Sequence, residues 1–383
     1  MKNLLFTLIL YLPIVTLNAQ NCNNLSTAVS PDGLYIYFTS DRDGGNFEIY
    51  KANIDGTNVI RLTNSSDKKS FPSLSPNGTK VLFQSADYSA ASEIYMMNND
   101  GTNLIRLTTN NVYDGYPNFS PDGQSIVFSA WDNSIYPEIF TMNQDGTNRT
   151  QITNTPGSDW YYAPKFNPAG TKIYFLVSQN GNFNIVMMDL NGSNWINVTP
   201  PNTYGYIDLY PSFSSDGLKI VFSTSEYSGN GGILDLIMIN ADGSGWQRIT
   251  TSANSERFDL PVFHPTDNGK LFFSYTPSGG RSSIKEMNTD GTGIIELAAC
   301  SPNGLEDDPE TKVLSFYPNP ANDFLNVNIK GEILIKIFDL AGRLVLVSRD
   351  NKTNISQLNP GIYTIYLKDE NSDLIRFDKL IKN

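Results

Sequence analysis

One sequence pattern occurs six times between residues 25 and 300, and it constrains the fold more than any other feature. Each copy has a turn like Ser-Pro-Asp-Gly, an apolar alternating segment, a variable segment, an Asp-Gly turn and an end like Arg-Leu-Thr. The copies follow one another at about 45–50 residues, the length of one four-stranded propeller blade. The first turn lies at 30–33, 75–78, 120–123, 167–170, 214–217 and, stretched, 264–269. The second lies at 55–56, 100–101, 145–146, 191–192, 242–243 and 290–291.

The second copy illustrates the predicted blade. Strands are expected at 71–74, 80–84, 93–97 and 104–108. They are separated by a Ser-Pro-Asn-Gly turn, a loop and an Asp-Gly hairpin, and both turn sequences suit tight turns. No segment has a helical period long enough to compete. The repeat region is therefore predicted to be a six-bladed, all-β propeller.

The strand order of such blades separates two faces. The connections between first and second strands and between third and fourth strands are tight, near-identical turns; we call their side the turn face. The remaining connections, within and between blades, are long and dissimilar, and they form what we call the loop face. Binding residues concentrate in variable loops on a rigid frame, so function is expected on the loop face.

The repeat also resembles a known family. Its first copy contains Asp-Gly at 32–33, Tyr-Phe-Thr-Ser-Asp-Arg-Asp-Gly at 37–44, Glu-Ile-Tyr at 48–50, Asp-Gly-Thr at 55–57 and Arg-Leu-Thr at 61–63. These residues are similar to the PD40 (WD40-like) repeat of the TolB family. The resemblance implies a six-bladed propeller for residues 20–300. It does not imply one activity, because the repeat occurs in scaffold proteins and in non-catalytic parts of peptidases.

The C-terminal part has a different pattern. Residues 301–312 are acidic and turn-rich, as in a linker, and short β segments follow in 313–383. A small Ig-like β-sandwich is predicted there. The motifs at 317–321, 339–343, 358–363 and 379–382 strongly resemble the C-terminal sorting domain of the type IX secretion system. This resemblance implies contact with the type IX machinery and passage through the outer membrane; an Ig-like carbohydrate or adhesion module is the alternative.

The N-terminus and the charge agree with export. Residues 1–19 are predicted to be a signal peptide, with a basic start, an apolar stretch and a small-residue cleavage site. No later segment is apolar enough for a transmembrane helix. The net charge is −12, and the tail from Val313 has nine Lys or Arg against eight Asp or Glu, so the acidity lies in the repeats. A nucleic-acid partner is not expected. We expect the protein to pass through the periplasm and to be either secreted or held at the outer-membrane surface.

The two cysteines, Cys22 and Cys300, flank the repeat region. Exported proteins form disulfides, and the ends of a closed ring are neighbours in space. A bridge that clasps the ring is therefore predicted, with two unrelated thiols as the alternative.

Catalytic motifs are sparse in this sequence. The single histidine, His264, falls in a turn, and no Gly-x-Ser-x-Gly motif is present. The segment Asp41–Asp43 is similar to the start of a calcium loop, but it lacks the later acidic ligand. We therefore expect no catalysis, no metal and no cofactor. The alternative is a polysaccharide hydrolase or lyase that uses loop carboxylates, with the candidates Asp114, Asp159, Asp208 and Asp259.

The loops are rich in Tyr and Trp, which favour binding surfaces. Some of them, such as Tyr116 and Tyr210 next to proline, are expected to pack between blades. We predict a monomeric, non-enzymatic protein that binds a protein or glycan through the loop face. The predicted ligand-binding residues are Asp114, Trp160, Tyr161, Tyr206, Asp208, Arg257 and Asp259.

Overall fold

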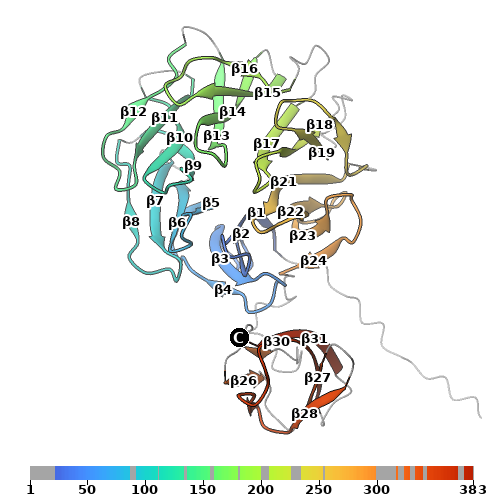
Figure 1. Cartoon of the computed structure of the whole chain (residues 1–383). Coiled ribbons are helices and arrows are strands. Elements are labelled where there is room, and N and C mark those ends of the chain that lie inside the picture. The colour runs from blue at the N-terminus through green and yellow to red at the C-terminus, as the bar shows by residue number, and fades with distance from the viewer. Residues whose placement is uncertain are drawn as a thin grey trace, which may run out of the picture. The chain divides into compact units, whose positions relative to one another are not determined.

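The computed structural model describes residues 22–86, 92–110, 112–132, 136–155, 159–179, 182–199, 207–225, 234–252, 255–298, 316–317, 323–327, 333–339, 343–369 and 375–382. Contacts divide the chain into two units, Met1–Gly304 and Leu305–Asn383. Within the described ranges the chain forms strands and turns and no helix (Figure 1). The all-β prediction is confirmed. The predicted signal peptide (1–19) and linker (301–312) lie outside the described residues.

The first unit holds six four-stranded antiparallel meanders in its described residues, one for each sequence repeat. A single parallel bridge, Phe183 to Ile207, joins the fourth and fifth meanders. The strands are β1 (Asn24–Val29), β2 (Tyr35–Ser40), β3 (Glu48–Asn53) and β4 (Ile60–Arg61); β5 (Lys68–Leu74), β6 (Lys80–Ala86), β7 (Glu93–Asn98) and β8 (Ile105–Arg106); β9 (Asp114–Phe119), β10 (Ser125–Ala130), β11 (Glu138–Asn143) and β12 (Thr150–Gln151); β13 (Trp160–Phe166), β14 (Lys172–Gln179), β15 (Asn182–Asp189) and β16 (Ile196–Asn197); β17 (Ile207–Phe213), β18 (Lys219–Ser225), β19 (Asp235–Asn240) and β20 (Gln247–Arg248); β21 (Arg257–His264), β22 (Asp267–Thr276), β23 (Ser283–Asn288) and β24 (Ile295–Leu297).

The meanders stand around a common centre, and the first strand of each lies nearest to it (Figure 1). Strand β21 of the last meander contacts β1 of the first. Direct hydrogen bonds join these two meanders. The backbone N–H of Asn24 donates to the carbonyl oxygen of Ser282 at 2.9 Å, and the Asn24 side-chain amide donates to the carbonyl of Ala298 at 3.0 Å. The two ends of the repeat region therefore meet.

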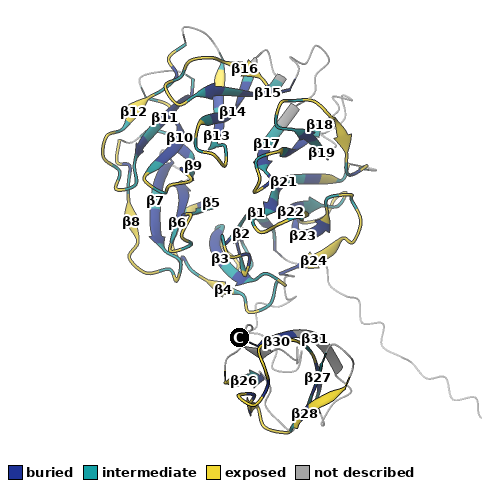
Figure 2. Ribbon diagram, viewed as in Figure 1, coloured by how far each residue is buried: buried dark blue, intermediate teal, exposed yellow. Residues whose placement is uncertain are grey.

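The apolar core lies between neighbouring sheets. One cluster joins Tyr37 and Ile49 of the first meander to Val81, Phe83 and Met97 of the second. The second and third strands are largely buried, whereas the short fourth strands are exposed (Figure 2). Burial of these β-rich segments supplies the main driving force for packing one sheet on the next.

A polar network explains two of the repeated motifs. The carboxylate of Glu93, at the start of β7, accepts hydrogen bonds from the Thr108 hydroxyl at 2.5 Å and the Arg106 guanidinium at 2.6 Å. The Thr108 oxygen in turn accepts the backbone N–H of Ile94 at 3.0 Å. Equivalent trios occur in the first and fifth meanders: Glu48, Arg61 and Thr63, and Asp235, Arg248 and Thr250. The Glu-Ile-Tyr and Arg-Leu-Thr motifs thus tie the third strand to the chain that follows the fourth.

The Asp-Gly turns also serve packing between meanders. Gly101 has φ +86°, and a Cβ there would lie 2.9 Å from the carbonyl oxygen of Leu62 in the preceding meander. Gly56 has φ +81°, and its Cβ would lie 2.4 Å from the backbone nitrogen of Ala298. Only glycine combines the left-handed backbone with this close approach. The first meander therefore meets the last through the same kind of turn that joins the first two.

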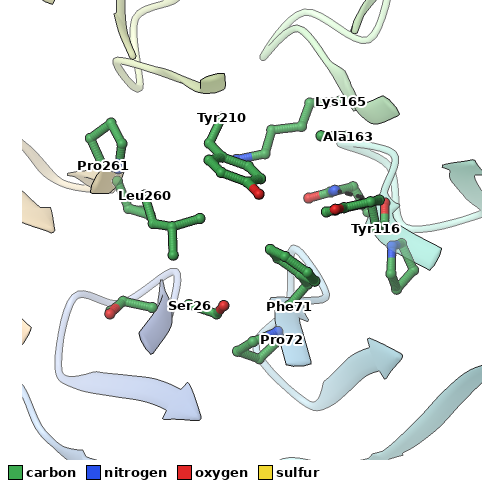
Figure 3. A pocket seen from close by; sticks show the side chains of 13 residues that line it. Ser26, Phe71, Pro72, Tyr116, Ala163, Lys165, Tyr210, Leu260 and Pro261 are labelled. Atoms are coloured by element: carbon green, nitrogen blue, oxygen red, sulfur yellow. Dashed lines mark hydrogen bonds between the residues drawn. The ribbon is translucent and has the colours of Figure 1, made fainter. Parts of the chain in front are cut away.

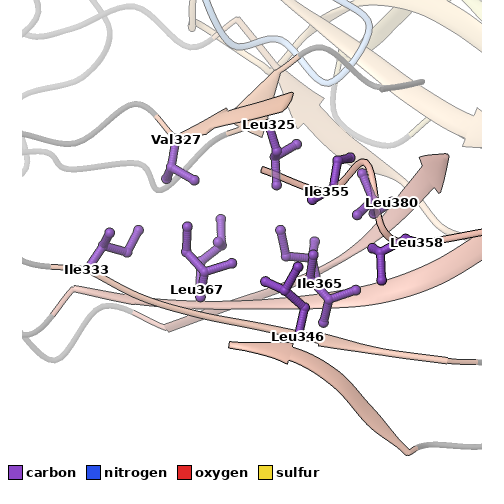
Figure 4. Close-up of a cluster of buried hydrophobic side chains, with 11 residues drawn as sticks. Leu325, Val327, Ile333, Leu346, Ile355, Leu358, Ile365, Leu367 and Leu380 are labelled. Atoms are coloured by element: carbon purple, nitrogen blue, oxygen red, sulfur yellow. The ribbon is translucent and has the colours of Figure 1, made fainter. Parts of the chain in front are cut away.

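The second unit contains two sheets, one with the order β25-β26-β29 and the other with the order β28-β27-β30-β31. Its strands are β25 (Phe316–Tyr317), β26 (Phe324–Val327), β27 (Ile333–Phe338), β28 (Leu344–Ser348), β29 (Lys352–Asn354), β30 (Gly361–Asp369) and β31 (Ile375–Lys382). Buried aliphatic side chains from both sheets, such as Leu325 and Ile365, form one core (Figure 4). The unit has a hydrophobic core of its own; the Ig-like class stays a prediction.

Candidate ligand-binding surface

Every first strand of the propeller unit carries a bulge at the same place. In the pairing of β5 with β6, for example, Ser70 is opposite Gln84 and Ser73 is opposite Leu82. The two residues between Ser70 and Ser73 therefore lie opposite a single residue of β6. One residue at each bulge has a positive φ, between 46° and 55°. We call these six residues the axial ring: Ser26, Phe71, Tyr116, Ala163, Tyr210 and Leu260. All six line one cavity, so the bulges turn their side chains toward the common centre (Figure 3).

Aromatic side chains occupy much of the axial ring. The ring centroids of Phe71 and Tyr116 are 4.4 Å apart, and those of Phe71 and Tyr210 are 5.9 Å apart. Burial raises the pKa of both tyrosines, so their hydroxyl groups stay neutral at physiological pH. Tyr116 and Tyr210 pack against the buried cluster of the fourth and fifth meanders, as expected for residues between blades, and the bulge also brings both of them to the axial cavity.

An aromatic cluster lies at the loop-face end of the third and fourth meanders. We call it the aromatic patch: Tyr113, Trp131, Tyr136, Trp160 and Tyr162. Trp131 and Trp160 are 40% and 39% exposed, and their rings are 6.5 Å apart. Trp160 also contacts Tyr136 at 6.1 Å and Tyr162 at 5.6 Å.

The aromatic patch is continuous with the axial ring. The ring of Tyr116, an axial-ring residue, lies 6.1 Å from the ring of Tyr162 and 6.5 Å from the ring of Tyr113, both in the aromatic patch. The exposed Trp131 and Trp160 therefore pack on the partly buried Tyr113 and Tyr162, which in turn contact the axial ring. Such a rigid, amphipathic surface suits ligand contact, because little side-chain entropy is lost on binding.

The predicted ligand residue Trp160 belongs to this patch, but its neighbour Tyr161 does not. Successive residues of a strand point to opposite faces. Tyr161 is accordingly only 2% exposed, and its ring meets Phe175 and Trp195 at 5.9 and 5.5 Å. Its hydroxyl oxygen lies 2.8 Å from that of Thr155, which donates to it. The prediction of Tyr161 as a surface residue is corrected: it is part of the core.

Asp114 is also corrected from a surface residue to a buried one. It is fully buried, and one carboxylate oxygen lies 3.1 Å from the Arg149 guanidinium, while the other has no hydrogen-bond partner. Arg149 also pairs with Asp132 at 2.5 Å. Burial raises the pKa of Asp114 to about 6, although Arg149 opposes the rise. Asp114 is thus a buried member of an ion pair, and its role in ligand binding stays a prediction.

Arg257 and Asp259 lie together at the loop-face end of β21. The Arg257 side chain is half exposed, and its guanidinium lies 3.2 Å from the Asp259 carboxylate. Asp259 also accepts the Ser223 hydroxyl at 2.9 Å and the Leu260 N–H at 2.8 Å. Burial raises its pKa. Of this pair, the Arg257 side chain is the more accessible to a ligand.

The remaining predicted residues are less fully described. Tyr206 lies outside the described residues, and Asp208 is described only through its backbone, which pairs with Thr224 in β17. Cys22 is buried, whereas Cys300 lies outside the described residues. The hydrogen bond from Asn24 to Ala298 brings the flanking segments together, and the clasp stays a prediction.

The candidate calcium loop is engaged by protein donors. Asp41 accepts hydrogen bonds from the backbone and side chain of Asn23, and Asp43 accepts the Tyr50 hydroxyl at 2.7 Å and the Arg61 guanidinium at 3.2 Å. In the part of the chain that the structure describes, no group of three or more His, Cys, Asp or Glu side chains could hold a metal ion.

Two features of the site were not predicted as such. The axial ring could have been found from the proline that follows the ring residue in five of the six copies, at 72, 117, 164, 211 and 261. The contact between Trp131 and Trp160 could not, because it depends on the loop after β10 meeting the start of β13. No periodic signal places two such segments side by side.

Comparisons with known proteins agree with this fold. Residues 70–195 and 137–343 match the PD40 family, the TolB beta propeller domain, and together they cover more than half of the chain. Residues 315–383 match the secretion system C-terminal sorting domain. Within the described ranges no helix could cross a membrane.

Several solved structures share the propeller. TolB from Acinetobacter baumannii has a TM-score of 0.56 at 20% identity, over 72% of this chain and 63% of that one. The alignment thus spans less than two thirds of that protein. A TolB-type protein from Agrobacterium tumefaciens has a TM-score of 0.51 at 22% identity, over 60% and 80% of the two chains. Kuenenia stuttgartiensis hydrazine synthase has a TM-score of 0.54 at 17% identity, over 73% and 44%.

The likeness to these structures shows the fold alone. The sorting domain directs export by the type IX secretion system to the cell surface or outside. The chain belongs to the TolB β-propeller family and ends in a secretion-system sorting domain.

Proposed function

We propose that this exported propeller is a non-enzymatic, monomeric protein that binds a protein or glycan ligand through its loop face. The observation that carries the proposal is the aromatic patch, with Trp131 and Trp160 about equally exposed and held by ring contacts. The ligand would stack on the tryptophans, and Arg257 would supply a charged contact at the same end of the propeller. The six meanders would form a ring of six blades that keeps this surface rigid.

The alternative, a polysaccharide hydrolase or lyase, needs two carboxylates that face a substrate. The buried ion pair between Asp114 and Arg149 and the hydrogen bonds that occupy Asp259 argue against this arrangement. Binding without catalysis therefore accounts better for the described carboxylates.

The test begins with finding the ligand. The exported protein is applied to a glycan array and used to capture proteins from cultures of the producing cells and their neighbours. Binding of each ligand found is then measured for Trp160→Ala and Trp131→Ala. Loss of a central aromatic anchor costs about 2 kcal/mol or more, roughly a 30-fold weaker affinity.

The matched control is Trp195→Ala. Trp195 is 39% exposed, like Trp160, but it follows the Asn-Gly turn at 191–192 and so belongs to the turn face. This variant should bind normally. The proposal is wrong if Trp160→Ala binds as tightly as the wild-type protein while a folded Trp195→Ala binds more weakly. That result would place the ligand on the turn face instead of the loop face.

A further inference from the structure

A cavity lies on the propeller axis, on the turn side of the axial ring. It has a volume of about 60 Å³ and is lined by residues from all six first strands. Each first strand runs from the loop face to the turn face. The lining residues are the axial ring and residues that follow it in sequence, such as Pro72, Asn118 and Val262, and none precedes it. We call this space the axial cavity. The aromatic residues of the axial ring, Phe71, Tyr116 and Tyr210, lie between this cavity and the aromatic patch.

One lining residue is charged. Lys165 of β13 extends into the cavity toward Tyr210 (Figure 3). No carboxylate among the described residues pairs with its ammonium group, and burial alone lowers its pKa, to about 8. The group is therefore still mostly protonated at neutral pH. A partly buried cation without a counter-ion is costly, and proteins normally pair such groups.

The fourth meander departs from the repeat in two linked ways. The residue two places after the axial ring is small or uncharged in the other copies: Ala28, Ser73, Asn118, Ser212 and Val262. In β13 it is Lys165, and the ring residue beside it is Ala163, where three other strands have Phe or Tyr. The small side chain leaves the space that the lysine enters. A cation is thus set into the axis of a chain whose net charge is −12.

The size and walls of the cavity define what can enter. Binding sites for whole small molecules occupy about 300–1,000 Å³. A cavity of about 60 Å³ admits one small group, while the bulk of the ligand stays outside. The walls combine prolines, Val262 and the neutral phenols of Tyr116 and Tyr210. A carboxylate fits this setting, because it is compact, singly charged and can accept hydrogen bonds from both ammonium and phenol.

We propose that the axial cavity is a second binding site, open to the turn face, which takes a carboxylate group of a ligand and pairs it with Lys165. The turn face therefore carries one specific feature on the axis, although its six turns are near copies. This site is separate from the aromatic patch and does not depend on the ligand proposed there.

The experiment uses the exported protein with ¹³C-labelled lysine and follows the Cε resonances by NMR. Acetate is the probe, acetamide is its neutral isostere, and inorganic phosphate is the larger anion. The Lys165 resonance is assigned by its loss in Lys165→Met. We expect acetate to move it saturably, with a dissociation constant on the order of millimolar, and acetamide to leave it unchanged. The internal control is Lys172, which already pairs with Asp189 and should not respond.

A second variant, Ala163→Leu, keeps the lysine but fills the cavity. Leucine occupies the equivalent ring position at 260, with a similar φ, so the variant should fold. It should abolish the acetate response. The proposal is overturned if acetate moves Lys165 no more than exposed lysines, if Ala163→Leu responds like wild type, or if phosphate binds more tightly than acetate. Trp160→Ala should respond to acetate like wild type, which separates this proposal from the loop-face function.

Discussion

Thr108 offers the sharpest test of the polar network behind the Arg-Leu-Thr motif. Its side chain is 5% exposed, and its oxygen makes two hydrogen bonds. It accepts the N–H of Ile94 at 3.0 Å and donates to the carboxylate of Glu93 at 2.5 Å. Thr108→Val keeps the shape and removes both bonds. Each buried group left without a partner costs about 1–3 kcal/mol. Because Glu93 keeps Arg106, we expect a loss of about 3 kcal/mol in the free energy of unfolding.

The assay is equilibrium unfolding in urea, followed by tryptophan fluorescence, since all the tryptophans lie in the propeller unit. The midpoint should fall while the slope with urea stays unchanged. Thr108→Ser retains the hydroxyl and should lose much less. Thr102→Val is the exposed control: its hydroxyl donates to Asp100 in a solvent-exposed turn, so we expect a change below about 0.5 kcal/mol.

If Thr108→Val lies within about 0.5 kcal/mol of wild type, the two buried hydrogen bonds contribute little net stability. The repeated Glu, Arg and Thr would then need another explanation. A loss as large in Thr102→Val as in Thr108→Val would equally contradict the reasoning, because burial is what distinguishes the two threonines.

Two further predictions concern the buried carboxylate and the tail. Because burial raises the pKa of Asp114 from 3.8 to about 6, the folded state binds a proton that the unfolded state lacks between these values. The contribution of this proton to the free energy of unfolding is complete below about pH 4 and is lost as pH rises through 6, a change of up to about 3 kcal/mol. Urea unfolding measured across this pH range should show the change in the wild-type protein and not in Asp114→Asn. Deletion of 313–383 should leave a folded propeller in the periplasm of a type IX-competent host; immunoblots that find the truncated protein in the medium would contradict this.

The strands of the repeat could be predicted because turn residues and apolar alternation occur together in each copy. In the second copy the predicted segments 80–84 and 93–97 correspond to β6 and β7, each slightly longer than expected. The predicted fourth strand, 104–108, shortens to β8. The reason is that Thr108 turns inward to Glu93, which ends the ladder early.

Side-chain direction was harder to predict than strand position. Simple alternation assigns neighbouring residues to opposite faces, but it does not say which of them meets solvent. Of the adjacent pair at the start of β13, Trp160 is exposed and Tyr161 is buried. At the bulges alternation itself fails, because an extra residue with positive φ redirects the chain. Tyr116 and Tyr210 therefore line the axial cavity in addition to packing against neighbouring meanders.

Charge pairing depends on contacts that sequence spacing does not reveal. Asp114 meets Arg149 from the far end of the same meander, so an apparent loop carboxylate becomes a buried one. The opposite case is more informative for function. Each position of the blade occurs in six copies in this chain. A residue that differs from its equivalents in the other copies, and that has no compensating contact, is not explained by the needs of folding. Lys165 meets this condition, and with Ala163 it changes both charge and volume at one point of the axis. A comparison of equivalent positions across repeats would select this point, whereas a search for loop residues passes over it.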